Sequence, residues 1–232
     1  MFTNPATTNP ADTAFHHMLH MGSSSKRISQ IKPFYQNGWR ETRLDLMADC
    51  EPDIVCDVLD MQTIPSAAYQ SVYSSHNIEH VFAYQARAVL KDTRRLVADG
   101  GFALIRTPDM QKIARIFAEK GPDAVLYESP AGPITAHDTL YGKDSILADG
   151  RHYMAHKCGF SAQSLCDALM ASDFARVHVQ RKGFELYALA LTHPLPKNDT
   201  FTFQGTSFQQ GLPDWLDDYY HHIQQLTQGA TA

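Results

Sequence analysis

The sequence predicts an α/β domain with a parallel sheet, and three features of one stretch carry that prediction. Residues 69–75 form a short run of β-favouring side chains. Residues 78–97 then repeat apolar side chains every three to four positions, which is the period of an amphipathic helix. The pair Gly100 and Gly101 ends this run, and residues 102–105 have the pattern of a buried strand. A strand, a helix and a strand in this order favour a right-handed crossover between parallel strands.

Polar residues follow both of these strands. They are Ser74, Ser75, His76 and Asn77 at the end of the first strand, and Thr107 and Asp109 at the end of the second. Parallel strands place their carboxyl ends at one edge of the sheet, which is where ligands bind in open α/β sheets. The sequence therefore predicts a ligand site at this edge.

Length and composition suit one domain with a full core. The chain has 232 residues, 44% of them hydrophobic, and a formal charge of −5. A phosphate-binding face usually shows as a basic excess, so no nucleic-acid partner is expected. No apolar run reaches the ~20 residues that span a membrane, and the four cysteines lack C-x-x-C spacing. We therefore expect a cytoplasmic protein without membrane partners or a disulfide framework.

Three short segments together resemble one family. Residues 73–81 read Tyr-Ser-Ser-His-Asn-Ile-Glu-His-Val, residues 95–101 read Arg-Leu-Val-Ala-Asp-Gly-Gly, and residues 105–109 read Ile-Arg-Thr-Pro-Asp. This combination resembles the fourth-to-fifth strand segment of class I S-adenosylmethionine-dependent methyltransferases, and a small bacterial branch most of all. That branch usually has Lys-Pro where this chain has Ala98 and Asp99. The resemblance implies S-adenosylmethionine as cofactor. It also implies a Rossmann-like, seven-stranded, mostly parallel sheet with one antiparallel strand and helices on both faces.

The amino-terminal segments depart from the family pattern. Residues 1–25 are rich in Thr, Asn, Pro, Ala, His and Ser, and they are expected to form a flexible tail. The methyltransferase-like domain is predicted over residues 26–192, with residues 26–31 as its first strand. The family's glycine-rich loop, which approaches the cofactor, would then fall near Gln30, Ile31 and Lys32. Gln30 and Lys32 would stand where glycines are expected, so a catalytically inactive binding or assembly subunit is the second hypothesis.

The next two strands supply acidic candidates for binding the cofactor. Residues 43–46 follow Gly38 and Trp39 and resemble the second strand, where the family's acidic residue accepts the ribose hydroxyls. The candidates there are Asp45 and its neighbour Leu46. Residues 53–58 are predicted as the third strand, and either Asp57 with Val58 or Asp60 with Met61 would contact the adenine. Ser74 and Ser75 complete the predicted cofactor site.

The carboxyl-terminal half is predicted from helix and hairpin patterns. Residues 110–120 and 161–171 read as helices, and residues 174–180 and 184–192 as an antiparallel hairpin around Gly183. Residues 127–150 are expected to form a long loop over the cofactor edge. His137, Asp138, Tyr141, His152 and His156 are candidates to line an acceptor pocket there. Residues 193–232 read as a linker and a helix at 213–226 that packs on the domain or on a second copy, so a homodimer is possible.

The segment at residues 76–80 also matches H-x-x-E-H, the inverted zinc-peptidase signature. On a helix, His76 and His80 would share one face and bind zinc, while Glu79 would activate water. The motif lies at the start of the predicted helix and no third ligand helix follows it. A zinc-dependent hydrolase is therefore the third hypothesis, and no resident metal is expected.

The leading hypothesis is methyl transfer from S-adenosylmethionine to a small-molecule or saccharide-type acceptor. His76 would lie at the transfer edge and is the candidate catalytic residue, because an imidazole there can orient or deprotonate an acceptor.

Overall fold

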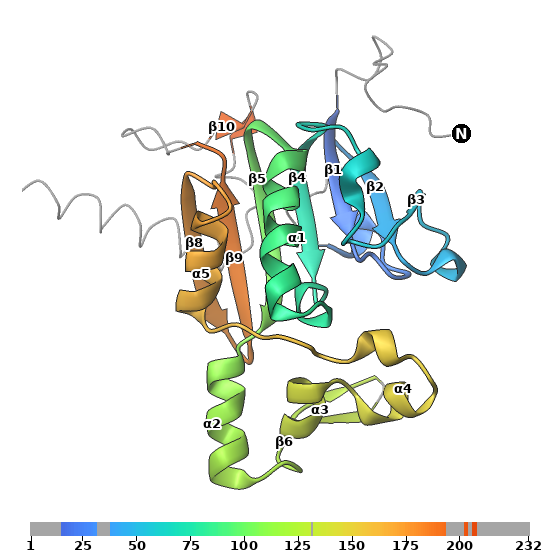
Figure 1. Ribbon diagram of the computed structural model, residues 1–232, viewed down its shortest axis with the longest axis vertical. Helices are drawn as coiled ribbons and strands as arrows, with labels where there is room; N and C mark the ends of the chain where they lie inside the picture. The colour runs from blue at the N-terminus through green and yellow to red at the C-terminus, as the bar shows by residue number, and fades with distance from the viewer. Residues whose placement is uncertain (1–14, 32–37, 131, 194–201, 204–205, 208–232) are drawn as a thin grey trace, which may run out of the picture.

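The computed structural model of the protein describes residues 15–31, 38–130, 132–193, 202–203 and 206–207 (Figure 1). Seven strands form one sheet in the order β3-β2-β1-β4-β5-β9-β8. Their bounds are β1 His16–Met21, β2 Trp39–Asp45, β3 Ile54–Val55, β4 Tyr69–Ser75, β5 Val97–Pro108, β8 Arg176–Lys182 and β9 Glu185–Leu191. Neighbouring strands from β3 to β5 are parallel, whereas β9 runs antiparallel to β5 and β8. The predicted seven-stranded sheet with one antiparallel strand is confirmed.

The first strand lies earlier in the chain than predicted. Strand β1 lies inside the sheet between β2 and β4, so residues 15–25 are not a flexible tail. Residues 26–31, predicted as this strand, instead contain a 3-10 helix at Ile28–Gln30. The polar appearance of β1 is misleading because its histidine at position 20 is only 1% exposed, and the Nδ1 of His20 lies 2.7 Å from Glu41 Oε1. A buried histidine with a hydrogen-bond partner is tolerated in a central strand.

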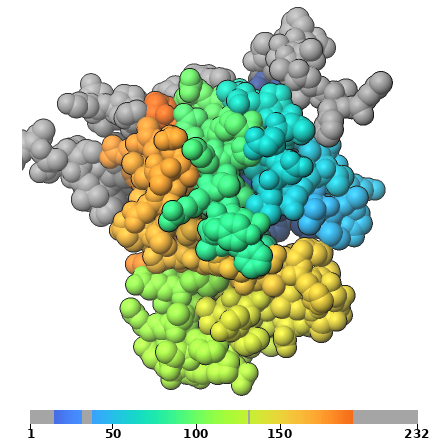
Figure 2. Space-filling model, viewed as in Figure 1, coloured from blue at the N-terminus to red at the C-terminus, as the bar shows by residue number. Residues whose placement is uncertain are grey.

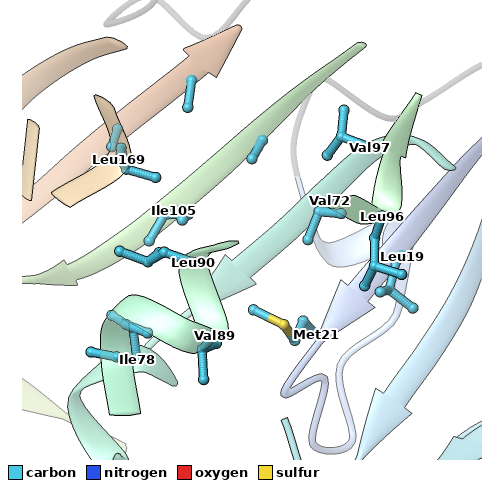
Figure 3. Close-up of a cluster of buried hydrophobic side chains, with 14 of the residues drawn as sticks. Leu19, Met21, Val72, Ile78, Val89, Leu90, Leu96, Val97, Ile105 and Leu169 are labelled. Atoms are coloured by element: carbon cyan, nitrogen blue, oxygen red, sulfur yellow. The ribbon is translucent and has the colours of Figure 1, made fainter. Parts of the chain in front are cut away.

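Two helices cover one face of the sheet. The helices of the described chain are α1 Ala83–Leu96, α2 Met110–Lys120, α3 Ala136–Tyr141, α4 Asp144–Ala148 and α5 Ala162–Met170. Figure 3 shows Leu90 of α1 and Leu169 of α5 in one buried cluster with Ile105 of β5. The period of these helices therefore places their apolar stripes on the sheet, as their sequences predicted.

The opposite face of the sheet carries a smaller apolar cluster. Met18, Phe102 and Leu104 are among its buried members. Within the described residues, Ile28 of the 3-10 helix and Ile31 directly after it add cover, and the helices that pack on the sheet lie on the other face. The family resemblance implied helices on both faces, and on this second face the described helix is the 3-10 helix at Ile28–Gln30.

Residues 110–157, called the cap below, form a layer beyond the carboxyl ends of the strands (Figures 1 and 2). The cap contains α2, a hairpin of β6 Val125–Ser129 and β7 Gly132–Thr135, α3, α4 and a 3-10 helix at His152–Met154. The prediction of a long loop over residues 127–150 was therefore wrong. Local signals build structure there: Gly132 has a φ of 91°, which suits the hairpin turn, and the Thr135 hydroxyl accepts from the Asp138 backbone N–H to cap α3.

The carboxyl-terminal part of the sheet follows its predicted pattern. Ser161 caps α5 by accepting from the Ser164 backbone N–H at 3.1 Å, and Gly183 turns the β8–β9 hairpin with a φ of 61°. Strands β10 Thr202–Phe203 and β11 Thr206–Ser207 form a separate short pair. The helix predicted at 213–226 lies outside the described residues. Within the described chain, no helix is both long and apolar enough to cross a membrane. All four cysteines are unpaired and partly buried.

Candidate functional site at the carboxyl ends of the strands

A cavity of about 560 Å³ lies at the carboxyl ends of the parallel strands. Its wall combines the loop after β1, the ends of β2 and β3, the residues after β4, the start of α1 and one segment of the cap. The volume falls within the range of small-molecule and cofactor sites, which is roughly 300–1,000 Å³. Of the predicted cofactor residues, five line it: Asp45, Leu46, Asp57, Val58 and Ser75. His76, the candidate catalytic residue, also lines it.

The loop after β1 is short, consists of small residues and packs closely against the loop after β4. It begins with Gly22, whose φ is 67°, and continues with three serines at positions 23–25. A Cβ on Gly22 would lie 2.1 Å from Asn77 Nδ2, so a side chain at this position would collide with the neighbouring loop. The chain therefore does carry a small-residue loop after its first strand.

Three predicted cofactor residues do not lie in this loop. Gln30 is exposed and Ile31 is buried in the apolar cluster on the second face of the sheet; neither lines the cavity. Lys32 lies outside the described residues. These predictions followed from placing the first strand at residues 26–31. With β1 at His16–Met21, the segment that approaches the cavity includes Gly22, Ser24 and Lys26.

Asp45 is fixed at the end of β2 by backbone hydrogen bonds. Its Oδ2 accepts from the Ser24 N–H at 2.7 Å and its Oδ1 from the Met47 N–H at 2.9 Å. Each carboxylate oxygen keeps a second lone pair for a ligand hydroxyl. The side chain therefore both holds the loop after β1 and presents acceptors at the cavity wall.

Arg43, which the sequence did not single out, ties two cavity loops together. Its side chain is 4% exposed. The guanidinium donates to the carbonyl oxygens of Lys26 at 3.1 Å, Glu51 at 2.7 Å and Cys50 at 2.9 Å, and also to that of Ser24. The rigid fork of arginine donors suits such a cluster of carbonyls. No local pattern separates this arginine from the exposed Arg40 on the same strand.

The cavity distinguishes the two acidic candidates after β3. Asp57 and Val58 line it, whereas Asp60 does not. The Asp57 Oδ1 accepts from the Leu59 N–H at 2.9 Å, which fixes the carboxylate beside the wall. Asp60 is exposed and its backbone carbonyl accepts from the Cys56 thiol. The geometry therefore favours Asp57 with Val58 as the candidate for adenine contact, and that role stays a prediction.

Buried polar atoms without a protein partner gather at the carboxyl end of β4. They are Ser74 Oγ, Ser75 Oγ and Asn77 Oδ1, none of which has a hydrogen bond to a described residue. Ser75 and Asn77 line the cavity, whereas Ser74 does not. A buried polar atom without a partner costs roughly 1–3 kcal/mol. A polar ligand in the cavity would satisfy those of Ser75 and Asn77.

His76 is held between two carboxylates. Its Nδ1 lies 3.1 Å from Glu79 Oε1 and its Nε2 lies 3.0 Å from Glu185 Oε1. Glu185 also accepts two hydrogen bonds from Arg106, at 2.6 and 2.7 Å, and one from the Tyr187 hydroxyl at 2.7 Å. Burial would lower the pKa of His76, but its bonds to Glu185 and Glu79 outweigh burial and raise the pKa to about 9. The imidazole is therefore cationic at neutral pH, and it suits orientation of an acceptor better than deprotonation.

The predicted acceptor residues of the cap are not among those that line this cavity. His137, Asp138, Tyr141, His152 and His156 do not line the cavity. The cap contributes Arg151, Tyr153, Met154 and Lys157 instead. Sequence periodicity could not distinguish these lining residues from the predicted His152 and His156, because all of them follow one another in a 3-10 helix and an irregular connection.

The H-x-x-E-H segment is not an α-helix. Residues Ile78–His80 form a 3-10 helix, and His76 precedes it with a φ of 52°. Among the described residues, the group whose ligand atoms lie close enough for one metal ion is Glu79, His80 and His156, without His76. The peptidase pattern requires His76 and His80 on one helical face, and these residues do not have that arrangement.

Comparisons with known proteins agree with this fold. No protein-family model matches the sequence, and no curated protein matches it significantly. A S-adenosylmethionine-dependent methyltransferase from Archaeoglobus fulgidus has a TM-score of 0.51 at 11% identity, over 78% of this chain and 88% of that one. Another from Mesorhizobium loti has a TM-score of 0.50 at 14% identity, over 80% and 94%. The DhpI-SAM-HEP complex has a TM-score of 0.50 at 16% identity, over 75% and 77%. The chain has the class I methyltransferase fold.

In this methyltransferase fold, the cavity lies at the topological switch point. The strand order reverses between β1 and β4, which are neighbours in the sheet although two strands separate them in sequence. Connections leave the two strands in opposite directions there, and this opens a crevice where ligands bind. Gly22 follows β1 and Asn77 follows β4, so their contact lies at the base of that crevice.

Proposed function

We propose that the protein transfers the methyl group of S-adenosylmethionine to a small-molecule or saccharide-type acceptor. The observation that carries the proposal is the cavity at the switch point, together with the unpartnered Ser75 Oγ and Asn77 Oδ1 in its wall. A ligand rich in hydroxyl, amino and carboxylate groups would satisfy such atoms. One of the solved structures with this fold is described as a complex with SAM.

Each part of the cavity wall suits one part of this cofactor. The backbone beside Gly22 would approach its amino-acid end, Asp45 would accept from the ribose hydroxyls, and Asp57 with Val58 would contact the adenine. When bound, the cofactor would supply an electrophilic methyl group. The chain would hold the acceptor close to that group, and proximity and orientation can supply most of the rate. Cationic His76 would orient the acceptor through its positive charge, because both of its ring N–H groups already lie beside carboxylates.

The case for an inactive subunit becomes weaker with the first strand relocated. That hypothesis depended on Gln30 and Lys32 replacing the glycines of the loop after the first strand. Neither residue lies in the loop directly after β1. It stays the second candidate. A homodimer and a cytoplasmic location also stay predictions, and light scattering on the purified protein tests the first of them.

Calorimetric titration with S-adenosylmethionine and S-adenosylhomocysteine tests the proposal directly. We expect binding in the ~1 μM–1 mM range of enzyme substrates. Asp45→Asn should weaken it about 10-fold or more, because a hydrogen bond to a charged group contributes roughly 1.5–3 kcal/mol. The matched control is Asp123→Asn, an exposed cap residue that does not line the cavity. Absence of heat with the wild-type protein would reject the proposal and favour the inactive subunit.

A further inference from the structure

We propose that Glu79, His80 and His156 bind one divalent transition-metal ion at the wall of the cavity. Their ligand atoms lie within 4.8 Å of one another, and Glu79 is fully buried. Two imidazoles and a carboxylate form a ligand set that suits Zn²⁺ and its neighbours in the first transition row. This inference does not depend on methyl transfer.

The backbone brings these three residues together from distant parts of the chain. Glu79 and His80 lie in the 3-10 helix before α1, whereas His156 lies in the segment that leaves the cap. The Glu79 carbonyl accepts from the N–H groups of Lys157 at 2.8 Å and Cys158 at 3.3 Å. These bonds fix the cap segment beside the 3-10 helix, so the group is part of the fold.

Hydrogen bonds to backbone carbonyls set the tautomers of both histidines. His156 Nδ1 lies 2.7 Å from the Thr139 carbonyl oxygen, and His80 Nδ1 lies 3.3 Å from that of Ala155. A carbonyl oxygen only accepts, so each Nδ1 carries the hydrogen and each Nε2 carries a lone pair. Neither Nε2 has a hydrogen bond to a described residue. Metal-binding histidines usually have this arrangement, with the second nitrogen donating to a carbonyl or a carboxylate.

The carboxylate is oriented in the same way. Glu79 Oε2 accepts from the Thr107 hydroxyl at 3.1 Å and Oε1 lies 3.1 Å from His76 Nδ1. Each oxygen has two lone pairs, so one remains available on each for an ion. Ligating carboxylates are commonly held by such neighbours.

The spacing allows a tetrahedral ion after small side-chain rotations. Zinc–nitrogen bonds of ~2.0–2.1 Å separate tetrahedral ligand atoms by about 3.3 Å. Two ligand atoms up to 4.8 Å apart would therefore approach each other by about 1.5 Å at most. His80 lines the cavity, which places such an ion at its wall. The fourth coordination position would then be open to water or to a ligand in the cavity.

Zinc titration of the metal-free protein, followed by calorimetry, tests the proposal. We expect one Zn²⁺ per chain, and visible bands of four-coordinate Co²⁺ when cobalt replaces zinc. His156→Asn can retain a donor to the Thr139 carbonyl but removes the Nε2 ligand. Its zinc affinity should fall by more than about 100-fold, beyond the 10–100-fold cost of disturbing a supporting hydrogen bond. The control is His152→Asn, because His152 is exposed and lies outside the group.

A second measurement uses the unaltered chain, in case the variant does not fold. Imidazole nitrogen NMR should show zinc shifting the Nε2 signals of His80 and His156, while their Nδ1 nitrogens stay protonated. No stoichiometric zinc, equal affinity in His156→Asn, or unshifted Nε2 signals would each overturn the proposal. Because zinc is titrated without the methyl donor, failure here leaves the proposed transferase activity standing.

Discussion

Gly22 is the residue at which the two loops of the switch point meet. Its φ of 67° lies in the left-handed region, and a Cβ there would lie 2.1 Å from Asn77 Nδ2. Gly150 has a φ of 84° but no atom within 4 Å of a Cβ. Replacing either glycine would therefore strain the backbone, but only a side chain at position 22 would also collide with a neighbouring residue.

We expect Gly22→Ala and Gly150→Ala each to lower the free energy of unfolding by about 1–2 kcal/mol, because alanine is disfavoured at positive φ. Only Gly22→Ala should also weaken binding of S-adenosylmethionine, by about 10-fold or more, since Asn77 must move. Denaturant unfolding and calorimetry measure the two effects. Equal donor affinities in the two variants would show that the loop contact does not shape the donor site.

The environment of His76 shows what a sequence omits at the scale of one residue. The pattern around residue 76 correctly placed this histidine at the cavity edge. It could not reveal Glu185, which lies 109 positions later and arrives through the antiparallel pairing of β9 with β5. That contact contributes to the raised pKa of about 9 and changes the chemistry available to the imidazole. A long-range partner of this kind has no local signal.

At the scale of elements, the segments with the clearest strand or helix pattern were predicted best. Strand β4 at Tyr69–Ser75 and helix α2 at Met110–Lys120 match their predicted bounds. Strand β1 was missed because three of its six residues are histidines. The useful signal was the apolar pair Met18–Leu19 followed by Met21 and Gly22, since a buried parallel strand needs apolar faces on both sides. The same error displaced the predicted cofactor loop onto Gln30, Ile31 and Lys32.

Strand β8 carries a histidine that should make stability depend on pH. Burial lowers the pKa of His178 to about 4, and the nearby positive charge of Arg176 adds to the shift. In the unfolded chain the pKa returns to about 6.5. The neutral folded form is therefore favoured above about pH 6.5, and its contribution is lost as the pH falls towards 4.

We expect this group to remove about 2 kcal/mol of unfolding free energy between about pH 7.5 and pH 5. His178→Gln should reduce that loss by a similar amount, while His152→Gln, at an exposed position, should leave it unchanged. Denaturant unfolding at the two pH values measures it. An equal loss of unfolding free energy between the two pH values in wild type and His178→Gln would contradict this role of His178.

At the scale of the whole molecule, the cavity joins pieces that are distant in the sequence. Gly22 follows β1, Asp45 ends β2, Ser75 ends β4, and Lys157 belongs to the cap. Unfolding would separate all of these pieces, so a ligand of this cavity would bind the folded chain and not the unfolded one. Ligand binding should therefore stabilise the molecule as a unit.

At a donor concentration of about 100 times Kd, this linkage contributes about 2.7 kcal/mol. For a chain of this size that raises Tm by roughly 5–10 °C. Asp45→Asn, binding about 10-fold more weakly, retains about 1.4 kcal/mol at the same concentration, so its Tm should rise by about half as much. Asp123→Asn should follow the wild type. Thermal unfolding with and without S-adenosylmethionine measures all three proteins. An equal rise in wild type and Asp45→Asn would mean that the donor binds without Asp45, because a ligand held by this carboxylate cannot stabilise both chains alike.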